Sequence, residues 1–313
     1  MIGAPYSRRG GLGHRKGAVY IYLFNGINWV ENQILASGYK HFGFDISING
    51  DKMLIGAPET IEIGSDKAGS VFVYENINSV WVETDHLLAP IGNQSEWFGS
   101  SVSLSDTWAL IGSPSDNTNG YRAGAAQLYH LINGIWVEDI KIFPADPAAN
   151  DYFGDDVAID NNKIVIGAHR KQFTNYSRLG AVFAYNFDGN LWQQQQKIMP
   201  SDLTDNKYFG SAVALNGETL MIGAQSDGEL ANGSGAAYQF SLSNDQWVES
   251  NKIFAPDAAQ GDQFGYALDI SSADKLIVSA IHDDDHGPQS GAVHIYQLNV
   301  GDLIYQNSFE SNQ

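Results

Sequence analysis

The chain has 313 residues and is strongly acidic, with 36 Asp and Glu against 17 Lys and Arg and a formal net charge of -19 at pH 7. This balance argues against nucleic acid as a partner, because phosphate binding needs a basic surface, and it favours cations or basic protein segments. Cysteine is absent, which excludes disulfides and thiolate metal sites. No apolar stretch approaches the roughly 20 residues that span a bilayer, so we expect no membrane span in this chain.

Four landmarks recur along the whole chain in a fixed order. Ile-Gly-Ala-like triplets begin at Ile2, Ile55, Ile111, Ile166, Ile222 and Val278. Glycines open alternating runs at Gly17, Gly69, Gly124, Gly180, Gly235 and Gly291. Tryptophan follows at Trp29, Trp81, Trp136, Trp192 and Trp247, with Leu303 in the sixth place. Phe-Gly pairs at Phe42, Phe98, Phe153, Phe209 and Phe264 lie 56, 55, 56 and 55 residues apart. A repeat this regular indicates a repeat architecture.

One unit, residues 153–200, shows the secondary structure that we expect in all of them. Apolar and polar residues alternate from Phe153 to Asp160, which predicts a first strand that begins at the Phe-Gly pair in each unit. The turn Asn161-Asn162 then leads to a short apolar strand. The runs after Gly180 and Trp192 predict a third and a fourth strand. No segment has the 3.6-residue spacing of a helix. Four antiparallel strands per unit predict an all-β propeller of six blades rather than a β-sandwich or a solenoid.

The two ends of the chain do not complete the pattern. Met1 aligns with Leu54 and Met221 inside the second strand, so the first blade should lack its innermost strand. We expect one domain over residues 1–305 and a tail over residues 306–313. Either the chain is a fragment of a longer, seven-bladed protein with a signal peptide upstream, or the ring closes with a three-stranded blade. We favour the fragment.

These motifs resemble the FG-GAP repeat of the integrin α-chain propeller. A Pro and an Asp ahead of the Phe-Gly pair, as at Pro256 and Asp257 before Phe264, are closer to the bacterial FG-GAP proteins. The resemblance implies a ring of blades that serves adhesion or ligand binding outside the cell. We therefore predict a secreted or cell-surface module that binds a protein or glycan ligand and has no catalytic activity.

The resemblance also implies a partner site on the phenylalanines. Integrin α-chains use aromatics around the propeller axis to receive a basic side chain from a partner domain. The corresponding candidates for ligand binding are Phe42, Phe98, Phe153, Phe209 and Phe264. Cation-π contact with a basic protein segment would suit the acidic chain. The alternative is that each phenylalanine only fills the space between two blades.

Acidic loops are the candidates for a metal site. The integrin-type Asp-x-Asp-x-Asp-Gly calcium loop is missing, because the turns between first and second strands, such as Asn216-Gly217-Glu218, offer too few oxygens. The loops after second and fourth strands should share one face. The loop after the second strand of the sixth unit carries Asp283, Asp284 and Asp285, and the loop after the fourth strand of the fifth unit carries Asp257 and Asp262. Clustered carboxylates suit Ca²⁺. The alternative is that these residues bond their own backbone as Asx-turns.

Other chemistry has little support in the sequence. Hydrolase, phosphate-loop and dinucleotide motifs are missing. The eight histidines do not recur at one position of the repeat, so we expect surface residues rather than a histidine metal site. The first alternative function is an enzyme that acts on polysaccharide through a pair of carboxylates. The second is a purely structural surface protein.

Overall fold

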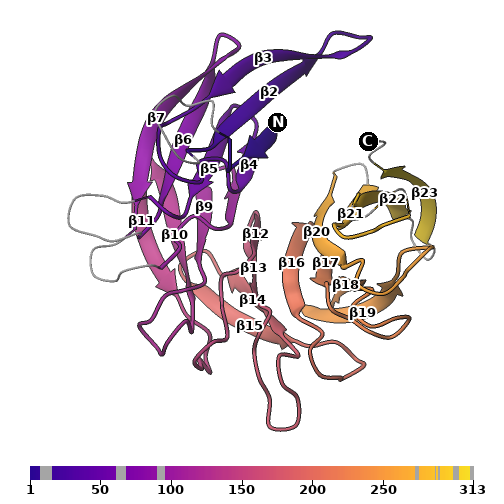
Figure 1. Ribbon diagram of the computed structural model, residues 1–313. Helices are drawn as coiled ribbons and strands as arrows, with labels where there is room; N and C mark the ends of the chain where they lie inside the picture. The colour runs from indigo at the N-terminus through magenta and orange to yellow at the C-terminus, as the bar shows by residue number, and fades with distance from the viewer. Residues whose placement is uncertain are drawn as a thin grey trace. The chain divides into compact units, whose positions relative to one another are not determined.

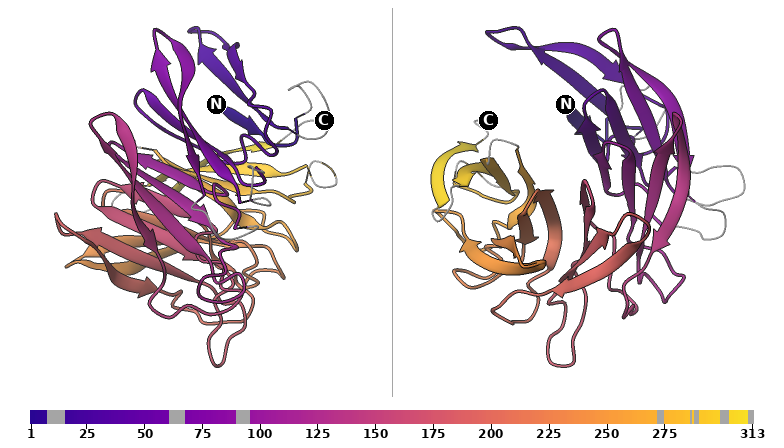
Figure 2. Two further views of the ribbon diagram at one scale, coloured as in Figure 1. Left: turned by 90° about the vertical axis from the view of Figure 1, so that its left-hand side faces the viewer. Right: turned by 180° about the vertical axis from the view of Figure 1, so that it is seen from behind.

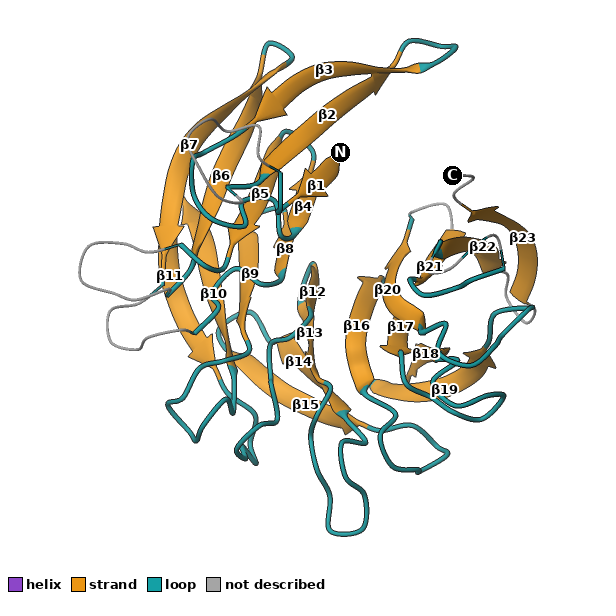
Figure 3. Cartoon of the chain, in the orientation of Figure 1, coloured by secondary structure: helices purple, strands orange, loops and turns teal. Residues whose placement is uncertain are grey.

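The alternating pattern of the sequence folds into strands throughout the described part of the chain. The computed structural model describes residues 1–7, 16–60, 68–89, 96–271, 275–285, 287, 290–298 and, for the backbone, 303–310. Within these ranges Figure 3 shows strands and loops and no helix. Accordingly, no described segment forms a helix of the length and apolarity that a membrane crossing requires.

The chain divides into two compact units, Met1–Ala149 and Asn150–Gln313. The first unit holds three antiparallel sheets in chain order (Figure 1). The first blade contains β1 (Ile2–Ala4), β2 (Ala18–Phe24) and β3 (Trp29–Leu35). The second contains β4 (Ile46–Asn49), β5 (Lys52–Ala57), β6 (Ser70–Ile77) and β7 (Val80–Leu88). The third contains β8 (Val102–Ser105), β9 (Trp108–Ser113), β10 (Ala125–Ile132) and β11 (Ile135–Ile142).

The second unit holds three four-stranded sheets, seen from two further directions in Figure 2. The fourth blade contains β12 (Val157–Asp160), β13 (Lys163–Ala168), β14 (Ala181–Phe187) and β15 (Trp192–Ile198). The fifth contains β16 (Phe209–Asn216), β17 (Thr219–Ala224), β18 (Ala236–Ser243) and β19 (Gln246–Ile253). The sixth contains β20 (Phe264–Ile270), β21 (Lys275–Ala280), β22 (Ala292–Leu298) and β23 (Leu303–Glu310). The predicted fold class, six propeller blades with a three-stranded first one, is confirmed.

Glycines of the repeat let the backbones of neighbouring blades approach closely. A Cβ on Gly167 of the fourth blade would overlap the carbonyl oxygen of Gly210 in the fifth, and Gly56 faces Gly99 in the same way. Gly180, which precedes β14, forms a parallel bridge with Phe209 of the next blade. The Phe-Gly pair and the Gly-Ala triplet recur together because they meet across the blade boundaries within each unit, where only glycine leaves enough room.

The first strands do not all begin at their Phe-Gly pairs, as the sequence pattern had indicated. Only β16 and β20 do so, whereas β4, β8 and β12 each begin four residues after the phenylalanine. The glycine after the ring has a positive φ in all five units, between 83° and 88°. Accordingly, β16 and β20 are irregular at this point, with register shifts between Phe209 and Ala212 and between Phe264 and Leu268.

Only some of the repeated tryptophans pack in the core between neighbouring blades. Trp81, Trp136 and Trp247 are buried, and Trp81 belongs to one core cluster with Ile21 and Leu35 of the preceding blade. Trp29 in the first blade is instead 70% exposed, and Trp192 is partly buried. The five tryptophans are therefore equivalent in their position along the fourth strand of the repeat but not in their burial.

Candidate metal centre

In each of the second to sixth blades, the third residue after the second strand has a buried polar side chain. The carbonyl of this residue accepts a hydrogen bond from the glycine that precedes the third strand, as Asp227 does from Gly235 at 2.9 Å and Asp283 from Gly291 at 2.9 Å. That glycine has a positive φ, which closes the loop tightly and points the polar side chain into the blade. The five buried residues are Thr60, Asp116, Lys171, Asp227 and Asp283.

In the fifth blade lysines neutralise the buried carboxylate. Lys207, two residues before Phe209, bonds to both Asp202 and Asp227. Lys252 on β19 bonds to the same two carboxylates at 2.6 and 2.9 Å. Burial alone would raise the pKa of Asp202, but hydrogen bonds from Lys252 and Lys207 outweigh it and lower the pKa to about 2. The same balance lowers the pKa of Asp227.

The third and fourth blades also pair their buried charges. Lys141 on β11 lies 2.5 Å from Asp116 and 3.8 Å from Glu96. Burial opposes ionisation of Asp116, yet the hydrogen bond from Lys141 and further bonds from Thr118 lower its pKa. In the fourth blade the order of charges is reversed, with Lys171 at the turn and Asp151 in the loop 2.8 Å away. Each of these three sites contains its own cation.

The sixth blade has the carboxylates without the lysines. Asp262 stands two residues before Phe264, where the fifth blade has Lys207, and Ser308 pairs with His294 in the register where Lys252 pairs with Tyr238. Within the described residues no Lys or Arg forms an ion pair with Asp257, Asp262 or Asp283. Ligand atoms of Asp257, Asp283 and His294 lie within 4.8 Å of one another.

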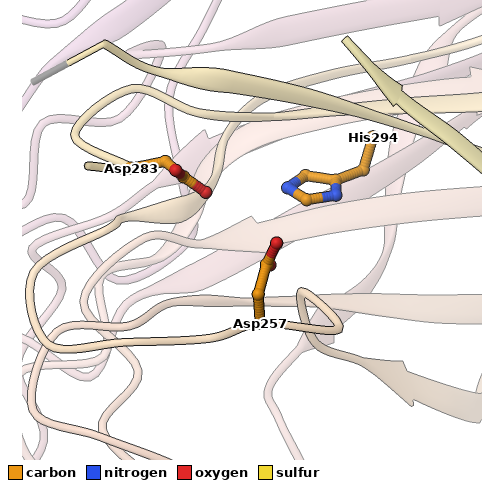
Figure 4. Close-up of side chains that lie close together, drawn as sticks. All are labelled: Asp257, Asp283 and His294. Carbon is orange, nitrogen blue, oxygen red and sulfur yellow. The ribbon is translucent and has the colours of Figure 1, made fainter. Parts of the chain in front are cut away.

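The elements of the sixth blade hold these groups from three sides. Asp257 lies in the loop between β19 and β20 and is exposed, Asp283 follows β21, and His294 lies within β22. Figure 4 shows both carboxylates turned toward the imidazole. His294 is fully buried, and its ring packs edge-on against Phe264 at 5.4 Å. One side of the cluster is therefore fixed in the core, and the Asp257 side faces solvent.

The electrostatics of the sixth blade are opposite to those of the fifth. Burial raises the pKa of Asp283, and the charges of Asp257, Asp262 and Asp285 raise it further. Burial also raises the pKa of Asp262, with Asp284, Asp257 and Asp285 adding to the effect. Because like charges crowd a buried site with no internal cation, a bound cation would relieve the repulsion.

The donor set fits a divalent metal ion. Carboxylate oxygens suit Mg²⁺, Ca²⁺ and Mn²⁺, whereas an imidazole nitrogen suits first-row transition metals. A site that combines both kinds of donor favours Mn²⁺ or Zn²⁺ more than the all-oxygen reasoning from the sequence suggested. With metal–ligand distances of about 2.0 to 2.6 Å, donors on one ion lie at most about 5 Å apart, which the cluster satisfies.

The structure brings together only some of the acidic residues that the sequence suggested. Asp257 and Asp283 join the cluster, and the buried Asp262 lies beside it. Asp284 and Asp285 are exposed and outside the three-residue cluster. Sequence reasoning missed His294, because a single histidine in an alternating strand looks like any other strand residue. Its alignment with Tyr238 and Phe183 at an inward-facing position was the available signal.

The five phenylalanines proposed as ligand-binding residues lie in the core. Each has no exposed surface, and their rings pack against aromatics of their own blades, as Phe42 does against Phe72 and Phe209 against Tyr238. Phe42 and Phe209 also share core clusters with residues of the preceding blade. A basic side chain from a partner cannot reach rings that are buried in this way. They fill the space between blades, which was the alternative interpretation, and we do not include them in the candidate site.

Comparison with solved structures gives a likeness of fold. The structure of a periplasmic gluconolactonase from Pseudomonas aeruginosa matches with a TM-score of 0.61 and 11% identity over 98% of this chain and 81% of that one. Such low identity shows the fold alone. It nevertheless corrects the prediction that the protein has no catalytic activity, because a propeller of similar fold is an enzyme. Comparison with curated protein sequences gives no significant match.

The sequence matches a family model repeatedly along its length. The model of the FG-GAP repeat matches residues 34–74, 81–129, 136–185, 192–240 and 247–296. Each match contains both a Phe-Gly pair and an Ile-Gly-Ala-like triplet. The matches cover more than half of the sequence, and the chain belongs to the FG-GAP repeat family.

Proposed function

We propose that the protein is a cation-dependent binding propeller whose sixth blade holds a divalent metal ion on Asp257, Asp262, Asp283 and His294. The observation that carries this proposal is the exchange of lysine for carboxylate at one repeated position. Lys207 neutralises the fifth blade, whereas Asp262 adds negative charge to the sixth. An external cation would take the place of the missing ammonium groups.

The geometry leaves room for a ligand on the metal. The two carboxylates and one imidazole of the cluster supply three donors when each binds through one atom, whereas Zn²⁺ takes four ligands and Mn²⁺ about six. Asp257 is exposed while Asp283 and His294 are buried, so the open positions face the Asp257 side. A carboxylate or hydroxyl oxygen of a protein or glycan ligand would complete the coordination there.

We place this activity outside the cytoplasm. Support comes from the resemblance to integrin α-chains, which act at the cell surface, and from the likeness to a periplasmic propeller. The acidic surface is also suited to attracting divalent cations from solution.

Thermal unfolding in EDTA and in micromolar Mn²⁺, Zn²⁺ or Ca²⁺ tests the proposal. The wild type should melt higher with Mn²⁺ or Zn²⁺ than in EDTA, because a ligand that binds only the folded state stabilises it. Asp283→Asn should lose this response. Asp245→Asn, which removes the same charge from the β18–β19 hairpin, should keep it.

Asp262→Lys is the sharper variant because it gives the sixth blade the lysine of the fifth. It should melt higher than the wild type in EDTA and should no longer respond to metal. A wild type whose melting temperature is the same in EDTA and in all three metals would refute the proposal. So would a full metal response in Asp262→Lys.

Hydrolysis of a lactone is the second candidate function. It is favoured by the likeness to the gluconolactonase propeller together with a cluster that suits a metal. A bound divalent ion would supply a Lewis acid and a water of lowered pKa. Acid release from gluconolactone, compared between wild type and Asp283→Asn in Mn²⁺, tests it: equal background rates for both proteins would reject lactone hydrolysis and leave binding.

A further inference from the structure

A second set of side chains occurs at the residue just before each Phe-Gly pair. All five residues have a left-handed backbone, with φ between 54° and 60°. They are His41, Trp97, Tyr152, Tyr208 and Gln263. A large side chain in this conformation is unusual and costs free energy.

Neighbouring positions indicate that the left-handed backbone conformation does not require these large side chains. In the three loops of the second unit, the residue two positions earlier also has a positive φ, and there the chain uses Asn150, Asn206 and Gly261. Asn and Gly are the residues that tolerate this conformation best. Because Tyr152 and Tyr208 occupy a position that would suit the same residues, their rings rather than their backbones account for the choice.

In the second unit these two tyrosines flank one histidine and one arginine. The rings of Tyr152 and Tyr208 each lie 5.6 Å from the ring of His169. The guanidinium of Arg170 lies 4.7 Å from the centre of the Tyr152 ring and 5.8 Å from that of Tyr208. Both tyrosines and Arg170 are partly exposed, and an Nη of the exposed Arg178 donates a hydrogen bond of 3.1 Å to the hydroxyl of Tyr208. The group is therefore an aromatic surface with Arg170 against both rings and Arg178 at its edge.

His169 fixes the arginine in place. Its Nδ1 lies 2.9 Å from Asp155, and its Nε2 accepts a hydrogen bond of 3.1 Å from Nε of Arg170. Within the described part of the chain, the guanidinium donates only this bond, and no carboxylate pairs with it. Its two terminal amino groups can therefore donate to an incoming acceptor in the forked geometry that matches a carboxylate.

We propose that Tyr152, Arg170 and Tyr208 form a binding site for an acidic sugar, a uronate unit of a glycan. The arginine fork would take the carboxylate, and a tyrosine ring would cover the apolar face of the sugar ring. Arg178 already donates to the hydroxyl of Tyr208, so Arg170 is the cation placed between the two rings. One such guanidinium suits one charge per sugar, whereas a densely charged polyanion would be repelled by a chain of net charge -19. The site uses none of the residues of the cation cluster, so it stands or fails independently of the metal.

Calorimetric titration with tetragalacturonate and with its fully methyl-esterified form, both in EDTA, tests this site. The two probes differ only in whether the carboxylates are free, and EDTA removes any contribution of metal. The wild type should bind the free acid roughly tenfold more tightly than the ester, the difference typical of a charge-assisted hydrogen bond.

The variants separate the two parts of the site. Arg170→Gln should abolish the preference for the free acid, and Tyr208→Ala should weaken binding of both probes. Tyr266→Ala, an exposed tyrosine of the sixth blade outside this group, should bind like the wild type. Equal affinity of the wild type for acid and ester, no binding of either probe, or a preference that survives Arg170→Gln would each overturn the proposal.

Discussion

His294 holds in β22 the register position that Tyr238 holds in β18. Tyr238 pairs with Ile222 and His294 with Val278, and each ring packs edge-on against the phenylalanine of its own blade, Phe209 or Phe264. The hydroxyl of Tyr238 donates to carboxylates that lysines already neutralise. The imidazole at the same place lies among carboxylates that no described lysine reaches. One scaffold position thus belongs to an internal ion network in one blade and to a candidate cation site in the next.

The metal-free protein should lose stability as the pH rises through the pKa values of Asp262 and Asp283. Both are raised above the ordinary 3.8 in the folded state, so the folded protein holds these protons more tightly than the unfolded chain. Their favourable contribution is complete below pH 3.8 and is lost above their folded pKa values.

Asp283→Asn in EDTA should therefore melt higher than the wild type at pH 7 and equally at pH 3.5, as measured by circular dichroism. In Mn²⁺ at pH 7 the order should reverse. A variant that melts lower than the wild type in EDTA at pH 7 would show that the Asp283 carboxylate does not destabilise the metal-free protein.

Lys207→Met should strongly destabilise the fifth blade. The lysine is 2% exposed and bonds to Asp202 and Asp227, so its removal leaves buried carboxylates with less compensation. Loss of one partner of a buried pair costs about 3 to 5 kcal/mol. Urea unfolding measures the loss, and the double variant with Asp227→Asn should recover part of it. No recovery in the double variant would contradict the proposed coupling.

Gly167→Ala should destabilise the boundary between the fourth and fifth blades. The added Cβ would overlap the carbonyl oxygen of Gly210, and the backbone itself must shift to make room. Overpacking of this kind costs about 1 to 3 kcal/mol. Gly228→Ala is the matched control, because its Cβ would make only ordinary contacts, the nearest at 3.7 Å. Equal urea midpoints for the two variants would count against the close approach.

Trp136→Ala and Trp29→Ala should differ in their effects although the two residues are equivalent in the repeat. Trp136 is 8% exposed and Trp29 is 70% exposed. Removal of the buried ring should cost roughly 3 to 5 kcal/mol, and removal of the exposed one less than about 1 kcal/mol. Chemical denaturation of both variants checks this, and a similar loss in both would mean that Trp29 is covered in solution.

The sequence by itself determined the repeat, the strands and the number of blades. This was possible because the Phe-Gly pairs and the Gly-Ala triplets are local patterns, and each recurs with its unit. It also indicated Asp257, Asp262 and Asp283, because loops after second and fourth strands must share one face of a blade.

Only the tertiary structure decided what those residues face. Whether a buried carboxylate meets a lysine depends on side chains from three elements, such as Asp227, Lys207 and Lys252, that are far apart in the sequence. The same reason hid His294, whose partners come from other strands, and it left the phenylalanines open between a partner site and the core. Burial is a property of the packed blades, and periodicity along one strand does not determine it.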